Sequence, residues 1–138
     1  MKHILCGYDG SEQAEKAFQF ALNLAEKFNA ALTVLAVIQL HEPAEAIETR
    51  TILENSTRHY ERLFQHLKQN AALHSSLPFD CKINVGSPAE QIVQMAEQLD
   101  VDLIVMGHRG KTAFHRWLIG SVAKQVLIYA HCAITIIR

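Results

Sequence analysis

The chain has 138 residues, of which 49% are hydrophobic and 20% charged, and its formal net charge at pH 7 is −1. This length and composition are typical of one soluble globular domain with a full core, and we take residues 1–138 as that domain. The near-zero charge argues against a general nucleic-acid binder. The lack of a membrane-length apolar run or a signal peptide argues against a membrane protein and for the cytoplasm.

The first half of the chain predicts strands and helices in alternation. Residues 2–8 form a short apolar strand, and a helix with one apolar stripe follows, capped at Ser11 and reaching Phe28. Residues 31–38 are a continuous apolar run rich in β-branched side chains, which suits a strand buried on both faces of a parallel sheet. A loop over residues 39–47 leads to a second helix over about 48–74.

The second half continues the alternation. Residues 79–85 predict a strand, and Ser87 is the expected N-cap of the helix that follows. Residues 103–106 are a short buried strand, a further helix opens at Ser121, and residues 132–138 form the last strand. This order of elements favours a parallel sheet with helices on both faces.

Three glycines surround the start of the last helix. Gly107 and Gly110 follow the apolar run, and Gly120 directly precedes Ser121. Glycines let backbone N–H groups approach an anion without interference from Cβ, and a helix that begins at Ser121 adds unpaired donors and the positive end of its dipole. The segment predicts a phosphate-binding loop. The alternative is that the glycines only turn a long surface loop.

Two familiar phosphate-binding motifs do not fit this loop. A P-loop needs a glycine five residues before Gly110, where Val105 stands. The dinucleotide fingerprint needs one residue between its first two glycines, but His108 and Arg109 both follow Gly107. The spacing that does fit is G-x2-G-x9-G-[ST], and it resembles the ATP-binding branch of the universal stress protein family.

The resemblance to that family extends over nearly the whole chain. Beyond the glycines it includes the segments ILCGYDGSEQAEKA, LAVI, VGSPAEQIV and DVDLIVMG. It implies a Rossmann-like α/β fold, an open sheet of five parallel strands in the order 3-2-1-4-5 with helices on both faces. In that order the strands that end at Asp9 and Gly107 flank the point where the strand order reverses, where such folds bind ligands.

The resemblance also implies a nucleotide site, position by position. Asp9 is expected at the ribose hydroxyls, the backbone of Val37 at the adenine edge, and Gly107 beside the ribose. The phosphates are expected among Gly110 and the start of the last helix. The residues predicted to bind nucleotide are Gly7, Tyr8, Asp9, Val37, Met106, Gly107, Arg109, Gly110, Gly120, Ser121 and Val122.

Structural roles remain open for several of these residues. Asp9 could serve as a helix cap or turn residue, and this role is compatible with a ligand contact. The Val37 side chain is core by default, so only its backbone is expected to bind. Arg109 could neutralise phosphates or be a solvated surface charge.

The predicted function is that of an ATP-binding stress protein that senses or signals through nucleotide occupancy. ATP is the expected cofactor, with Mg²⁺ held mainly by its phosphates, and the sequence nominates no catalytic residue and no protein metal site. The alternatives are a slow ATPase or phosphate-transferring enzyme and a nucleotide-free dimeric scaffold. An apolar last strand at the edge of the sheet further predicts a homodimer through that strand.

Overall fold

The computed structural model describes residues 1–40, 47–74 (the backbone alone at 74), 76–108 and 119–138. Strands and helices alternate along these ranges, as the sequence predicts, and most boundaries lie within a residue or two of the expected ones. The elements are β1 (His3–Gly7), α1 (Glu12–Phe28), β2 (Ala31–Ile38), α2 (Ile47–His74), β3 (Phe79–Val85), α3 (Pro88–Gln98), β4 (Leu103–Gly107), α4 (Ser121–Tyr129) and β5 (Ala133–Ile137).

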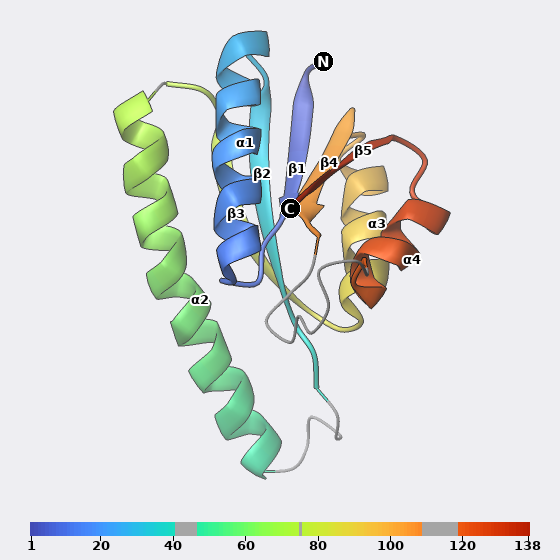
Figure 1. Cartoon of the computed structure of the whole chain (residues 1–138). Helices are drawn as coiled ribbons and strands as arrows, with labels where there is room; N and C mark the ends of the chain where they lie inside the picture. Colours follow the sequence, from blue (N-terminus) through green and yellow to red (C-terminus); the bar gives the residue numbers. More distant parts are fainter. Residues whose placement is uncertain (41–46, 75, 109–118) are drawn as a thin grey trace.

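The five strands form one sheet in the order β3-β2-β1-β4-β5, and every neighbouring pair is parallel. This confirms the predicted fold and strand order. The chain first builds outward from β1 to β2 and β3, then crosses back to place β4 on the other side of β1 (Figure 1). The strand order therefore reverses between β1 and β4, whose carboxyl ends lie at the same edge.

Helices cover both faces of the sheet, and strand residues alternate between the two cores. Ile4 and Val105 point into the core beneath α1 and α2, whereas Leu5 and Ile104 point into the core beneath α3 and α4. All four side chains are fully buried. Central strands buried on both faces explain why the sequence there reads as continuous apolar runs.

Helix α1 begins and ends with local capping. The Ser11 hydroxyl accepts a hydrogen bond from the N–H of Ala14 at 3.1 Å, and Asn29 ends the helix in the left-handed region with φ of 53°. The predicted apolar stripe is buried from Ala14 to Ala25. Phe28 is a correction to that stripe, because its side chain is 53% exposed where the helix runs past the edge of the core.

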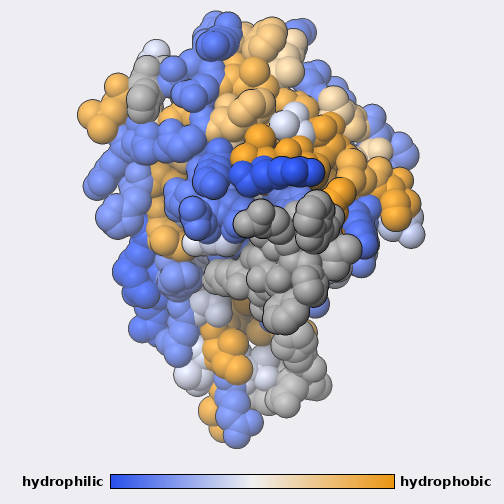
Figure 2. All heavy atoms as spheres, viewed as in Figure 1, coloured by the Kyte–Doolittle hydropathy of each residue, from blue (hydrophilic) through white to orange (hydrophobic). Residues whose placement is uncertain are grey.

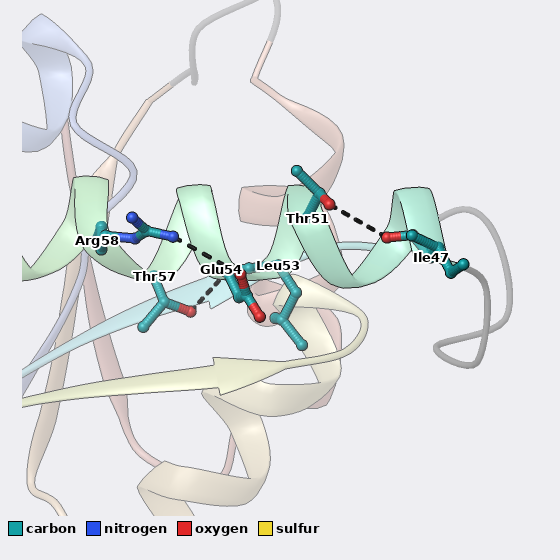
Figure 3. Close-up of polar contacts among 6 residues, drawn as sticks. All are labelled: Ile47, Thr51, Leu53, Glu54, Thr57 and Arg58. Carbon is teal, nitrogen blue, oxygen red and sulfur yellow. Dashed lines mark hydrogen bonds and ion pairs between the residues drawn. The ribbon is translucent and has the colours of Figure 1, made fainter.

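Helix α2 runs past the carboxyl edge of the sheet, so its two halves differ (Figure 1). Its buried apolar side chains all lie from the middle of the helix onward, at Tyr60, Phe64, Leu67 and Ala71. In the first half, Ile47 is 80% exposed and threonine hydroxyls turn back to the helix carbonyls. Figure 3 shows two such bonds, from Thr51 and Thr57, and the exposed ion pair between Arg58 and Glu54.

One further difference from the sequence predictions lies in the cap of α3, and α4 has an apolar surface. Ser87 occupies the N-cap of α3, but its side chain makes no capping hydrogen bond. In α4, Leu127 is 45% exposed and Ile128 beside it is 71% exposed, although both are apolar. Figure 2 shows this apolar surface as orange spheres over α4. No helix in the described ranges is both long and apolar enough to cross a bilayer.

Candidate functional site

The turn after β1 places a carboxylate at the reversal point. Asp9 is half-buried, and its Oδ1 accepts a hydrogen bond from the N–H of Ser11 at 2.9 Å. Gly10 follows with φ of 81°, a left-handed conformation that favours glycine. Asp9 therefore does take the turn role that the sequence left open, but through one oxygen only. Among the described residues Oδ2 has no hydrogen-bond partner.

Gly7 and Tyr8 lie on opposite faces of the sheet, next to that turn. A Cβ on Gly7 would lie 3.2 Å from Cδ1 of Ile92, so Gly7 faces α3. The Tyr8 ring is buried on the α1 and α2 face, and its hydroxyl donates to the carboxylate of Glu15. Both residues are at the predicted site, and both have packing roles there.

Gly107 ends β4 against the first turn of α1. A Cβ there would lie 2.9 Å from Cβ of Gln13 and 3.1 Å from its carbonyl carbon. Real Cβ atoms do not approach so closely, so any larger residue would push the helix away. This close approach brings the amino end of α1 over the carboxyl end of β4.

The backbone of Val37 lies beyond the last hydrogen bond between β1 and β2. That bond runs from the N–H of Tyr8 to the carbonyl of Leu35 at 2.9 Å. On the other side, the Ile38 carbonyl accepts from Gly86 of the β3 end. Because hydrogen-bonding direction alternates along a strand, the N–H and C=O of Val37 point toward β1, where β1 has already turned away. One donor and one acceptor therefore lie side by side at this edge.

The two ends of the predicted glycine loop are tied together by backbone hydrogen bonds. His108 donates its N–H to the Ile137 carbonyl at 2.6 Å, and its own carbonyl accepts from the N–H of Gly120 at 2.9 Å. The N–H of Gly120 is therefore occupied. The first intrahelical bond of α4 runs from Lys124 to the Gly120 carbonyl, and no side chain of the described ranges caps the helix. The N–H groups of Ser121, Val122 and Ala123 precede that bond and have no backbone partner among the described residues, so they can serve as donors.

Part of the predicted set lies elsewhere or outside the described residues. Met106 is 6% exposed, and its side chain lies in the core beneath α3 and α4. Arg109 and Gly110 fall outside the described residues. The sequence analysis missed three contributors, namely Gln13, Glu15 and the backbone of His108. No sequence signal identified them, because contacts between distant elements leave no periodic pattern.

The electrostatics of the site concentrate on one carboxylate and its phenolic neighbours. Burial raises the pKa of Tyr8, and its hydrogen bond to Glu15 and the negative charge of Asp9 raise it further. Burial and the charge of Asp9 also raise the pKa of Tyr60 on α2. Within the described ranges no group of three or more His, Cys, Asp or Glu side chains could hold a metal ion. The Asp9 carboxylate can thus accept hydrogen bonds from hydroxyl groups, and the N–H groups at the start of α4 can donate hydrogen bonds to an anion.

Comparison with known proteins assigns this arrangement to a family. A model of the universal stress protein family matches residues 1–138. Universal stress protein MJ0531 of Methanocaldococcus jannaschii is 32% identical over 141 residues, covering 99% of this chain and 82% of that protein. The universal stress protein UspA structure from Lactobacillus plantarum superposes with a TM-score of 0.93 at 31% identity, covering 99% of this chain and 97% of that one.

Two more distant structures contain nucleotides. A universal stress protein in complex with cAMP has a TM-score of 0.78 at 20% identity, with 99% of this chain and 97% of that chain covered. The universal stress protein from Archaeoglobus fulgidus in complex with dAMP has a TM-score of 0.65 at 20% identity, with 100% and 98% covered. At this identity the two structures establish the shared fold.

Proposed function

The chain belongs to the universal stress protein family, and on that premise we propose that it is a cytoplasmic sensor that binds ATP at the carboxyl ends of β1 and β4. One observation carries the proposal. Three kinds of group converge at the reversal of strand order: the Val37 donor and acceptor, the Asp9 carboxylate and the free amides of α4. The cAMP and dAMP complexes of distant relatives support an adenine nucleotide as the ligand class.

Each group matches one part of the nucleotide. Adenine presents a donor at N6 beside an acceptor at N1, which complements the N–H and C=O of Val37. The free Oδ2 of Asp9 can accept from a ribose hydroxyl, and a carboxylate is the stronger acceptor for such a bond. The N–H groups of Ser121 and Val122 lie at the positive end of α4 and suit phosphate oxygens. Mg²⁺ would arrive on the phosphates, because the described residues offer it no cage of their own.

The proposed role is binding with little turnover. Cys6 is the thiol on β1, and burial raises its pKa. A thiol that stays protonated is a poor nucleophile. His108 is 5% exposed, with both backbone groups engaged. We expect phosphate release well below the usual enzymatic range of about 1 to 1000 per second. Rapid turnover that resists purification would instead favour the slow-ATPase or phosphate-transfer alternative.

Gly120→Val tests the phosphate contacts. Gly120 has φ of −62° and ψ of 158°, a conformation that valine adopts freely, so the backbone can stay as it is. The branched side chain would then stand where phosphate must approach, and calorimetric titration with MgATP should show at least tenfold weaker binding than wild type. Gln125→Val adds the same residue to the exposed side of α4 and should bind normally.

Wild-type titrations with other ligands test the remaining contacts. AMP should bind more weakly than ATP because it lacks two phosphates. GTP should be rejected because guanine carries an acceptor where adenine carries its N6 donor. A titration that shows no binding of any adenine nucleotide would contradict the proposal and favour the alternative of a nucleotide-free scaffold.

We also propose that the protein is a homodimer through β5. This strand lies at the edge of the sheet, and the exposed Leu127 and Ile128 of α4 adjoin it in the chain. The Ile137 carbonyl faces β4, so by alternation the N–H and C=O of Ile136 face outward and are free to pair with a second copy. Ile136→Pro should therefore give monomers of 15.5 kDa by light scattering. Thr135→Pro, whose N–H faces β4, should instead destabilise the fold itself. A wild-type mass of 15.5 kDa at micromolar concentration would rule out the dimer.

A further inference from the structure

The turn that carries Asp9 is held from both sides by the hydrogen bonds of its neighbours. Before the turn, the Tyr8 N–H donates to the Leu35 carbonyl, and the Tyr8 hydroxyl donates to the carboxylate of Glu15. After the turn, the Ser11 hydroxyl caps α1 and the Ser11 N–H donates to Asp9. Only Asp9 and Gly10 lie between these anchored residues. The direction of the Asp9 side chain therefore depends on both anchors.

The Tyr8 anchor joins three elements. Tyr8 follows β1, Glu15 lies one turn into α1, and the Tyr8 ring packs on Phe64 of α2 with centroids 6.3 Å apart. Tyr60, also on α2, lies within the electrostatic influence of Asp9 and packs against Phe64 with tilted rings whose centroids are 6.2 Å apart. A rotation of the Tyr8 side chain would have to displace this packing. The hydrogen bond to Glu15 fixes the position of the Tyr8 hydroxyl within this packing.

We propose that Tyr8 and Glu15 are positioning residues for ribose recognition, because their hydrogen bond ties the end of β1 to the first turns of α1 and so aims the free oxygen of Asp9 at the ribose hydroxyls. The inference rests on the proposed nucleotide site and adds the residues that set its selectivity for ribose. Neither Tyr8 nor Glu15 touches the nucleotide through its side chain. Their effect is on discrimination between ribose and 2′-deoxyribose, and not on the phosphate contacts.

The test compares ATP with 2′-deoxyATP on wild type and variants by calorimetric titration. One hydrogen bond from a hydroxyl to a carboxylate corresponds to about a tenfold preference for ATP. Tyr8→Phe keeps the ring and its packing on Phe64 but removes the hydroxyl. We expect it to reduce the preference to about threefold or less while affinity for 2′-deoxyATP stays within about twofold of wild type. A merely structural role would weaken both ligands equally.

Variants of the exposed partner keep the test independent of folding. Glu15→Ala removes the acceptor at an exposed position and should lower the preference as Tyr8→Phe does. Glu15→Gln retains a carbonyl acceptor for the Tyr8 hydroxyl and should therefore keep the preference for ATP over 2′-deoxyATP. Glu12→Ala, an exposed glutamate one turn earlier that pairs with Lys16, is the matched control and should behave as wild type.

The possible results separate the two proposals. A wild-type protein that binds no adenine nucleotide overturns both the nucleotide site and this inference. A wild type that prefers ATP, with Tyr8→Phe and Glu15→Ala retaining the full preference, overturns the positioning role alone. Equal losses for ATP and 2′-deoxyATP in these variants also overturn it, because the hydrogen bond would then act only on the fold.

Discussion

Replacing Gly107 with alanine tests whether the end of β4 depends on the close approach of α1. The new Cβ would lie 2.9 Å from Cβ of Gln13, 3.1 Å from its carbonyl carbon and 3.3 Å from its carbonyl oxygen. Carbon atoms in ordinary contact are about 3.5 Å apart, so the first turn of α1 must move by roughly 0.6 Å. Two of the three atoms belong to the helix backbone, so rotation of the Gln13 side chain cannot relieve the contact.

We expect Gly107→Ala to lower the free energy of unfolding by about 1–3 kcal/mol, the usual cost of overpacking. Gly7→Ala is the matched control, because the closest atom to its Cβ would be the terminal methyl carbon of the Ile92 side chain, at 3.2 Å, and the next, Cβ of Met106, lies at an ordinary 3.7 Å. Neither glycine has a left-handed φ. Both alanines therefore also restrict the unfolded chain, which by itself raises the free energy of unfolding by about 0.4–1 kcal/mol. The difference between the two variants therefore isolates the clash with α1.

Urea denaturation followed by far-UV circular dichroism measures this difference, provided that the slope of the transition is unchanged. Because the displaced turn contains Ser11, the partner of Asp9, Gly107→Ala should also bind MgATP more weakly than Gly7→Ala. Identical urea midpoints for the two variants would refute the packing argument. Equal ATP affinity with different midpoints would refute only the link from α1 to the ligand.

Three further predictions use other parts of the molecule. Gly10→Ala forces an alanine to φ of 81° and should cost about 1 kcal/mol in urea unfolding, and unchanged stability would argue against the turn. The backbone N–H groups of Lys2 and His3 donate hydrogen bonds to the Asp102 carboxylate and lower its pKa. These hydrogen bonds therefore stabilise the fold fully above the ordinary pKa of 3.8, and their contribution is lost as the pH falls through the lower pKa of the folded state. The advantage of wild type over Asp102→Asn in thermal unfolding should therefore disappear in acid, and an advantage that persists there would contradict the assignment. Because Cys6 is fully buried, thiol reagents at pH 8 should modify the half-buried Cys132 in the native protein and reach Cys6 only on unfolding, as mass spectrometry of the peptides can check.

The sequence predicted the elements of this fold because each carries its own periodic signal. The uninterrupted apolar run at residues 31–38 indicated a strand buried on both faces, and β2 is such a strand. The helical pattern over about residues 48–74 likewise indicated α2, which spans Ile47–His74. Periodicity also misled at Phe28, since it identifies the apolar side of a helix but not where the neighbouring layer ends. The strand order came from family resemblance, because no local pattern encodes which strands become neighbours.

The sequence by itself determined which residues belong to the candidate site, namely Asp9, the glycines that follow residue 106, and Ser121. Only the tertiary structure decided which of their groups are free. Gly107 meets α1, the N–H of Gly120 is bonded to His108, and the Val37 backbone has no partner in the described part of the chain because β1 ends before it. The bond from Tyr8 to Glu15 likewise joins a strand end to a neighbouring helix. Each of these outcomes depends on where one element stops beside another, and that is fixed by packing across the sheet and not by the residues within either element.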